Sequence, residues 1–204
     1  MAAARKSKNR KKSIIREYAE IIVVAVLLAL FVRTFFAQAF RIPSESMEDT
    51  LLVGDFLFAN KLLYGAKIPF IDKRLPSIRE PRPGDIIIFK YPGDEKTPYI
   101  KRCVAVAGQT VELKGSTLYV DGVAQDESYT KWARGENLPR KYGPKTVEEG
   151  HVFMMGDNRD NSSDSRIWGS LDMDLIMGKA MFIYFSWNPQ KHMVRFTRIG
   201  DVIR

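Results

Sequence analysis

Cysteine and histidine are nearly absent from this chain. Its 204 residues include one cysteine, Cys103, and two histidines, His151 and His192. A single cysteine excludes an intramolecular disulfide and a C-x-x-C metal or redox site. Cys103 lies in an apolar run, where a small buried side chain is the expected role. The scarcity of histidine argues against a Ser-His-Asp hydrolase, and neither a G-x-S-x-G elbow nor an H-E-x-x-H zinc motif occurs.

Acidic residues are missing from the first 16 positions. The seven basic residues there account for all but one unit of the net charge of +8. A basic arm of this kind can bind phosphates, but here it directly precedes an apolar run. Lys and Arg on one side of such a run are typical of the cytoplasmic end of a membrane segment. The pattern favours a topology signal, and no nucleic-acid partner is expected.

Residues 21 to 40 form a long apolar stretch that contains one charge, Arg33. Its first part, IIVVAVLLALFV, would alone suit a buried helix, but with TFFAQAF it reaches the ~20 residues that a membrane span needs. Ala37-Gln38-Ala39 leaves a removed signal peptide open as an alternative. The long basic region favours a retained anchor. We therefore expect a cytoplasmic tail at residues 1–16, a transmembrane anchor at 17–37 and an extracytoplasmic domain at 38–204.

Helical periodicity is missing beyond residue 40, apart from one turn near residues 46–52. Short runs rich in β-branched and aromatic residues follow instead, most of them bounded by Gly, Pro, Asp or Asn. They lie at residues 55–64, 85–91, 99–108, 110–115, 117–122, 151–155 and 179–187. VELKGSTLYVDGVA is typical of a tight antiparallel ribbon. Polar stretches with Pro and Gly at residues 69–83 and 127–150 predict loops. The outer part is therefore expected to be mostly antiparallel β.

Two serines, Ser44 and Ser46, lie in a short polar interruption, IPSESMEDTL, just after the apolar stretch. They are either part of an ordinary turn or a nucleophile beside a membrane. Because histidine is scarce, lysine is the next candidate for the base that would activate a serine. Such a lysine must be unprotonated, and so needs a site of low dielectric that lowers its pKa.

Two lysines are candidates for this base. Lys131 completes an S-x-x-K pattern, but it lies in a polar loop without a K-T-G companion. Lys101 interrupts an otherwise apolar strand, and strand alternation sends it and Arg102 to opposite faces. One of these two charges is expected to point inward. The alternative is a lysine on the solvated face of an edge strand.

The densest polar stretch is GDNRDNSSDSR. A calcium loop counted from Asp157 or Asp160 lacks required ligands, and so this interpretation fails. A solvated loop and a buried polar network both remain open. Burial would require mutual neutralisation of two acids and two arginines, namely Asp160 and Asp164 with Arg159 and Arg166.

Four segments in order, IPSESMEDTL, GDFLFANK, YIKRCVAVAGQTVE and GDNRDNSSDSRIWGSL, resemble the motif boxes of bacterial type I signal peptidases. These are Ser/Lys-dyad endopeptidases that remove signal peptides from exported proteins. The resemblance covers nearly the whole chain. It implies a catalytic domain of coiled antiparallel β-sheets with a small β insertion, here residues 110–150. It also implies exported preproteins as substrates, no cofactor, and a single-pass location in the bacterial cytoplasmic membrane, with the bilayer as a partner and the catalytic domain outside.

The resemblance also implies roles for individual residues. Ser46 resembles the nucleophile, Lys101 the general base, and Ser162 the hydroxyl that orients the lysine. Ser44 resembles a side-chain donor to the oxyanion hole, beside the Ser46 backbone N–H. Residues implied to line small apolar substrate pockets are Phe40, Ile42 and Ile100. The implied supporting network consists of Gly156, Asp160, Asp164 and Arg166.

Some positions depart from the family pattern, and two other functions remain open. Asp49 stands where proline is usual, and Ala105, Ala107 and Gln109 replace the common Gly, Pro and Asp. A self-cleaving Ser/Lys regulator would carry a DNA-binding helical domain instead of an anchor. A non-enzymatic, membrane-anchored β module would need no buried lysine. A Lys101 that is exposed, or more than about 5 Å from Ser46, would favour that module.

Overall fold

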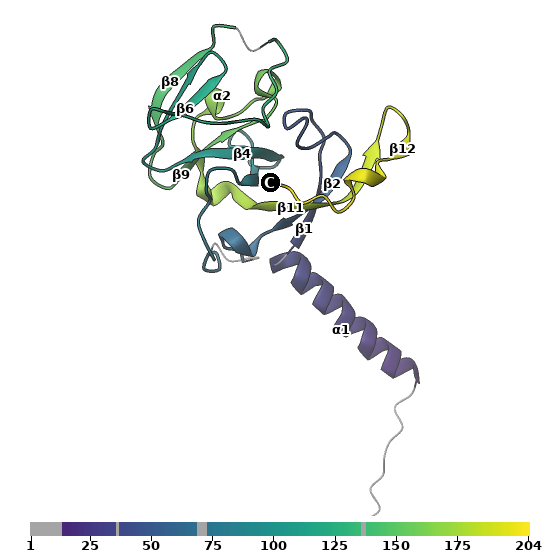
Figure 1. The fold of residues 1–204 in the computed structure, drawn as a ribbon. Helices are drawn as coiled ribbons and strands as arrows, with labels where there is room; N and C mark the ends of the chain where they lie inside the picture. The colour runs from purple at the N-terminus through teal and green to yellow at the C-terminus, as the bar shows by residue number, and fades with distance from the viewer. Residues whose placement is uncertain (1–13, 36, 69–72, 136–137) are drawn as a thin grey trace, which may run out of the picture.

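A single long helix projects from a β-rich body (Figure 1). The computed structural model describes residues 14–35, 37–68, 73–135 and 138–204, so most of the expected basic tail lies outside the described residues. The helix α1 (Ile14–Phe35) has Glu17 in its first turn and Arg33 in its last, both favourable to the helix dipole. In the part of the chain that the structure describes, no helix has both the length and the apolar content for a membrane crossing. The anchor at residues 17–37 stays a prediction.

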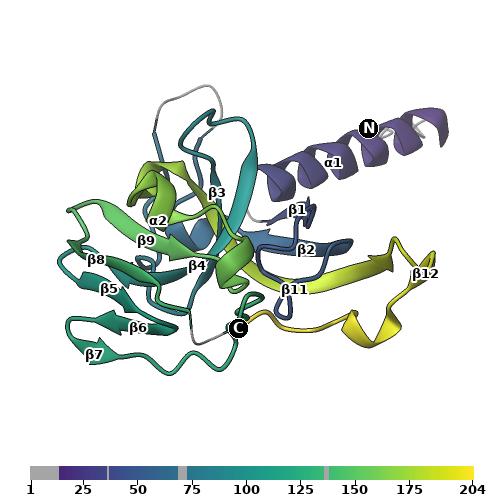
Figure 2. The ribbon, with the colours of Figure 1, turned by 90° about the horizontal axis from the view of Figure 1, so that it is seen from above.

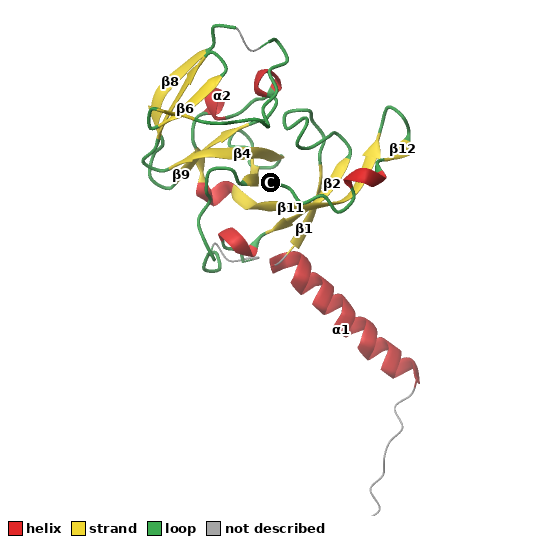
Figure 3. Ribbon diagram, in the orientation of Figure 1, coloured by secondary structure: helices red, strands yellow, loops and turns green. Residues whose placement is uncertain are grey.

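The body is mostly β, as predicted, and is built on a curled antiparallel sheet (Figure 3). Its strands run in the order β1-β2-β11-β3-β4-β9-β10, and β12 pairs with β11. Their bounds are β1 (Ala37–Arg41), β2 (Asp55–Asn60), β3 (Ile86–Lys90), β4 (Pro98–Val106), β9 (His151–Met155), β10 (Leu171–Asp172), β11 (Ile176–Asn188) and β12 (Met193–Val194). Short 3₁₀ turns lie at Leu62–Tyr64, Arg159–Asn161, Met173–Leu175 and Phe196–Arg198.

The curl arises in β11, which is long enough to pair with β2, β3 and β12. Its register shifts between Ala180 and Phe182 and again between Ile183 and Phe185. Such irregularities bend a strand and increase its twist. The bent sheet encloses one apolar cluster that joins strand residues, such as Ile88 and Ile100, to the turn after β1.

A second antiparallel sheet has the order β7-β6-β5-β8 and lies beside β4 and β9 (Figure 2). Its strands are β5 (Thr110–Lys114), β6 (Thr117–Val120), β7 (Val123–Ala124) and β8 (Lys141–Thr146), all within residues 110–150. The predicted ribbon is confirmed by the β5–β6 pairing. Its turns contain Gly115 and the Asp121-Gly122 pair, all with positive φ. The boundaries between tail, anchor, domain and insertion stay predictions.

Three local elements differ from the sequence-based expectations. Residues 37–41 form β1, paired with β2, where the sequence predicted no strand. Residues 141–146 form β8 where a loop was predicted, and only pairing with β5 explains a strand of sequence KYGPKT, which contains Gly and Pro. The short helix α2 (Ser165–Trp168) is N-capped by Asp164 in a stretch with no helical period. For β1 and β8 the pairing partner, not the pattern of the segment itself, decides the structure.

Candidate active site

Ser46 lies in a tight turn directly after β1. Its neighbours Met47 and Leu51 are fully buried, and the Leu51 N–H donates to the Met47 carbonyl at 2.7 Å. These two apolar side chains hold the turn against the sheet. The Ser46 carbonyl accepts from the Asn158 N–H at 3.1 Å, and the side chain of Asn158 donates to the Glu45 carbonyl. The buried side chains that follow Ser46 and the hydrogen bonds from Asn158 thus fix its position, and Ser46 is 7% exposed.

Lys101 reaches Ser46 from the middle of β4. Its Nζ donates to Ser46 Oγ at 2.6 Å and to the Ile100 carbonyl at 2.9 Å. Lys101 is 3% exposed, because its strand pairs with β3 through Ile87 and is covered by the turn that carries Ser46. The lysine is therefore neither on a solvated face nor beyond 5 Å from the serine. A non-enzymatic module has no need of this arrangement.

Burial changes the protonation of Lys101. Removal from water lowers its pKa to about 8, while the negative charges of Asp164 and Asp157 act in the opposite direction. Desolvation dominates because a buried ammonium loses its hydration. Near pH 8 about half of the side chain is neutral, and it can then accept the proton of the Ser46 hydroxyl.

Both charges of the Lys101-Arg102 pair are buried, whereas only one was expected to point inward. Arg102 is 3% exposed, and its guanidinium donates twice to Asp157, at 2.9 and 2.8 Å. Thr50 Oγ1 donates to the same carboxylate at 2.6 Å. The expectation failed because both faces of β4 are covered here, and a fully paired charge can be buried on the second face.

Two groups that can donate hydrogen bonds lie beside the Ser46 hydroxyl. Ser44 Oγ is 3.4 Å from Ser46 Oγ. Among the described residues, the Ser46 backbone N–H has no hydrogen-bond acceptor. A hydroxyl and a free N–H on one turn are the kind of donors that stabilise the charge developing on a carbonyl oxygen.

A cavity of about 240 Å³ opens in front of these groups. Ile100 lines it, but Ile42 is 2% exposed within the apolar core, and Phe40 packs on that core; neither lines this cavity. The cavity is lined by Pro43, Ser44, Ser46, Thr97, Pro98, Tyr99, Ile100, Lys101, Asn161 and Ser163. Residues 98–101 of β4 pair with β3 on one side only, since β9 begins its pairing at Arg102. A short length of free strand edge therefore borders the cavity.

Ser162 and Gly156 pack against each other behind the turn. A Cβ on Gly156 would lie 2.2 Å from Ser162 Oγ and 2.5 Å from the Ser46 carbonyl oxygen. Ser162 Oγ is buried and has no hydrogen-bond partner among the described residues, so the expected bond to Lys101 is not formed. A buried hydroxyl without a partner costs about 1–3 kcal/mol. A buried polar group of this kind calls for a structural or functional explanation.

The GDNRDNSSDSR segment is a largely buried polar network, but its pairing differs from the one considered. Asp164 pairs with Arg166 at 2.7 Å, as expected. Asp160 instead pairs with Arg140 at 2.7 Å. The remaining pair joins Arg159 to Glu127 at 2.6 Å. The sequence analysis did not identify three members of this network, namely Glu127, Arg140 and Asp157. Their partners lie 20 to 55 positions away in the chain, and no spacing in the sequence indicates such pairs.

Other candidate bases lie elsewhere. The Lys131 ammonium pairs with Glu48 at 3.0 Å, and this contact raises its pKa. Neither His151 nor His192 lines the cavity. Cys103 is fully buried, and burial raises the pKa of its thiol to about 12. Within the described ranges, no cluster of His, Cys, Asp and Glu could hold a metal ion.

Asp49 has a backbone conformation that proline cannot adopt. Its φ is 76°, whereas the proline ring holds φ near −65°. We expect Asp49→Pro to lower the free energy of unfolding by more than about 1 kcal/mol, although proline is usual at this position. The control Asp49→Gly removes the same side chain and permits positive φ, and so should leave stability unchanged or raise it by up to ~1 kcal/mol. Thermal unfolding of the two variants measures the difference, and equal melting temperatures would contradict the φ argument.

Comparison with known proteins gives consistent matches. Residues 15–187 match the family described as signal peptidase, peptidase S26. The chain is 35% identical to a signal peptidase I of Pseudomonas aeruginosa, over 96% of this chain and 82% of that protein. It is 36% identical to a signal peptidase I of Bacillus licheniformis, over 90% of this chain and 95% of that one. A crystal structure of a signal peptidase I from Enterococcus faecalis aligns with a TM-score of 0.45 and 32% identity, over 50% of this chain and 98% of that one.

Proposed function

From the premise that this chain belongs to the signal peptidase family, peptidase S26, and is a serine endopeptidase, we propose that Ser46 and Lys101 form its catalytic dyad. Its relatives support the cleavage of signal peptides as the activity. The observation that supports the dyad best is the 2.6 Å contact between Lys101 Nζ and Ser46 Oγ at a buried position. Side chains with these two functions need hydrogen-bond reach of each other.

The proposed reaction has two steps. Neutral Lys101 takes the hydroxyl proton as Ser46 Oγ bonds to the substrate carbonyl carbon, and the oxyanion is held by Ser44 Oγ–H and the Ser46 N–H. The carbon–nitrogen bond then breaks as Lys101 returns the proton to the leaving amine. Water then attacks the acyl carbon with Lys101 as base, the ester bond to Ser46 Oγ breaks, and Lys101 returns the proton to Ser46 Oγ. Ser162, whose buried hydroxyl has no hydrogen-bond partner among the described residues, is the proposed group that orients Lys101 during these transfers.

The free edge at residues 98–101 provides a place for an extended substrate. A peptide segment that adds to this edge by backbone hydrogen bonds would run past Ser46. Ile100, supported by Ile42 and Phe40, would then limit the size of the residue before the cleaved bond. We propose small residues at −1, and small or short aliphatic residues at −3.

We propose that α1 attaches the enzyme to the bacterial cytoplasmic membrane as a single-pass anchor, with its N-terminus in the cytoplasm. The support is the basic, acid-free start of the chain and the exposed apolar side chains along α1, such as Ile22 and Leu27. A substrate whose apolar signal segment lies in the same bilayer would meet Ser46 at high effective concentration. Exported preproteins are the proposed substrates.

The alternatives have less support. A self-cleaving regulator is one alternative. Self-cleavage after Ala37-Gln38-Ala39 is a separate hazard of the proposed enzyme itself, because this sequence has small residues at −1 and −3. In the structure, however, these residues begin β1 and pair with β2 from Asn60 to Phe58. A cut after Ala39 requires β1 to separate from the sheet.

The test is incubation of the purified chain with a secretory precursor that has Ala at −1. The matched blank is the Ser46→Ala protein prepared in parallel. We expect cleavage after the Ala, and a precursor with Phe at −1 should be cut at least about 100-fold more slowly, because each excess methylene costs about 1–3 kcal/mol in a small pocket. N-terminal sequencing of the product locates the cut. Equal cleavage of both precursors, or cleavage in the blank, would contradict the proposal.

A further inference from the structure

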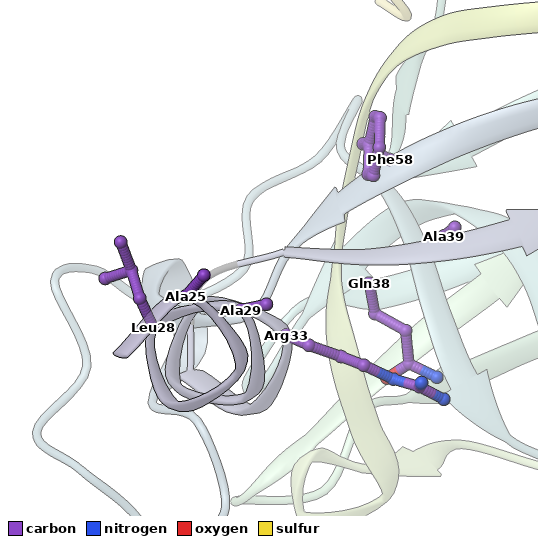
Figure 4. Close-up of a pocket in the computed structure, with 7 residues that line it drawn as sticks. All are labelled: Ala25, Leu28, Ala29, Arg33, Gln38, Ala39 and Phe58. Atoms are coloured by element: carbon purple, nitrogen blue, oxygen red, sulfur yellow. The ribbon is translucent and has the colours of Figure 1, made fainter. Parts of the chain in front are cut away.

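An apolar cavity of about 690 Å³ lies where α1 meets the edge of the large sheet (Figure 4). Its apolar lining comes from the helix and from the first two strands of the sheet. The residues are Ala25, Leu28, Ala29, Ala39 and Phe58. Two polar side chains, Arg33 and Gln38, complete it and extend side by side, away from Leu28. The cavity is thus apolar at one end and polar at the other.

A second cavity, of about 310 Å³, adjoins the polar end. Gln38 lines both cavities, and Lys61, which follows β2 in the sequence, lines the second. Burial lowers the pKa of Lys61, and the nearby positive charge of Arg33 adds to this effect. Neither cation has an ion-pair partner among the described residues. Two positive charges therefore lie within electrostatic reach of each other.

Three other charged residues of the second cavity contact one another or nearby backbone groups, namely Arg74, Asp172 and Asp174. Asp174 lies 3.5 Å from the guanidinium of Arg74, which also donates to backbone carbonyls. Asp172 accepts from the Asp174 N–H at 2.8 Å. The remaining charged residues of this cavity are Lys67, Lys90 and Glu95. Arg33 lines the apolar cavity and Lys61 is within its electrostatic reach, so an anion between these two side chains would neutralise both.

We propose that this junction binds one anionic phospholipid. Its phosphate lies between Arg33 and Lys61, with the amide of Gln38 as a further donor, and one acyl chain follows Ala25, Ala29 and Phe58. The proposal rests on the proposed attachment of α1 to a membrane, which supplies the lipid. A free phosphate would leave the apolar cavity empty, and an uncharged signal segment would leave both cations unneutralised. A phospholipid has the required anion and the required chain in one molecule.

The experiment measures lipid retention by the full chain in a mild non-ionic detergent, using native mass spectrometry. With phosphatidylglycerol and phosphatidylcholine present in equal amounts, we expect one phosphatidylglycerol per chain. Lys61→Gln should weaken its binding about fivefold, the effect of one basic residue near a lipid phosphate. Lys141→Gln is the matched control, because Lys141 is exposed on the small sheet and the substitution removes the same charge. An equal effect of the two substitutions would overturn the proposal.

A second variant tests the acyl-chain half of the site without changing charge. Ala29→Trp should fill the apolar cavity and reduce retention at least fivefold, whereas Leu30→Trp, one position further round the helix, should not. Displacement of the lipid by a synthetic signal peptide without acidic residues would assign the cavity to substrate and overturn the proposal. Cleavage of a precursor in detergent, measured on every sample, separates these outcomes. Lost lipid selectivity with intact cleavage counts against this site alone, and absent cleavage in the unmodified chain counts against the proposed function.

Discussion

Lys101→Met is expected to abolish cleavage and to stabilise the folded protein. Removal of the proposed general base should lower kcat/KM by about 10⁴-fold, the upper range for such a group. The lysine also destabilises the fold, because its pKa falls from 10.5 to about 8 on burial, which corresponds to about 3 kcal/mol. Methionine has a similar volume and no charge, so it removes this penalty without leaving a cavity. Loss of activity with a gain in stability is typical of a strained catalytic position.

The lowered pKa of Lys101 determines how the stability of the protein changes with pH. Below pH 8 Lys101 is protonated in both the folded and the unfolded protein, and the free-energy cost of burying its charge is fully present. The unfolded state binds more protons between pH 8 and 10.5, so the stability of the unmodified protein rises over this window. The melting temperature of Lys101→Met should therefore exceed that of the unmodified protein at pH 7, and the two should converge toward pH 10.5.

The pH dependence of kcat/KM is measured over the same pH range. For the unmodified enzyme, kcat/KM should rise with pH through an apparent pKa near 8, as the amine of Lys101 becomes neutral. The control Lys101→Arg keeps the charge, cannot act as a base, and should be inactive without the gain in melting temperature. A rising limb with a midpoint near pH 6.5 that persists in Lys101→Met would assign the base to a histidine.

Gly156→Ala is expected to disable the site through a single methyl group. The added Cβ would lie 2.5 Å from the Ser46 carbonyl oxygen and 2.2 Å from Ser162 Oγ. The glycine cannot move away easily, because its N–H donates to Asp164 at 3.1 Å and its carbonyl accepts from Arg159 at 3.2 Å. We expect the turn that carries Ser46 to shift instead. A displacement of about 1 Å costs about 10²-fold in rate, and the overpacking should cost about 1–3 kcal/mol of stability.

The control for this substitution is Gly122→Ala. Gly122 has φ of 79° and no atom within 4 Å of an added Cβ. Alanine there introduces only backbone strain, which costs about 1–2 kcal/mol, on a turn of the small sheet. We therefore expect similar losses of melting temperature in the two variants but a loss of kcat/KM in Gly156→Ala alone. Full activity of Gly156→Ala would show that the turn tolerates the methyl group and that Ser162 has no positioning role through this contact.

The sequence by itself predicted the β class and most of the strands. The alternation of DFLFAN agrees with the buried and partly exposed faces of β2, and the apolar run IIIF forms the fully buried part of β3. Such patterns report local periodicity, which each segment carries within itself. They failed for β1 and β8, whose structure depends on pairing with β2 and β5. Pairing between segments is a property of two stretches at once, and no single stretch encodes it.

The candidate active site shows the same difference between what the sequence predicts and what the fold decides. The sequence alone identified Ser46 and Lys101 as candidates, because a polar break and a charge in apolar surroundings are visible in one dimension. Only the tertiary structure decided that Lys101 Nζ and Ser46 Oγ lie 2.6 Å apart and that Arg102 is buried against Asp157. It also left Ser162 Oγ without a hydrogen-bond partner within the described ranges. These contacts join residues far apart in the chain, and their geometry depends on the curl of the sheet. The lowered pKa of Lys101 has the same origin, since desolvation is produced by the surrounding fold and not by the neighbours of the lysine in sequence.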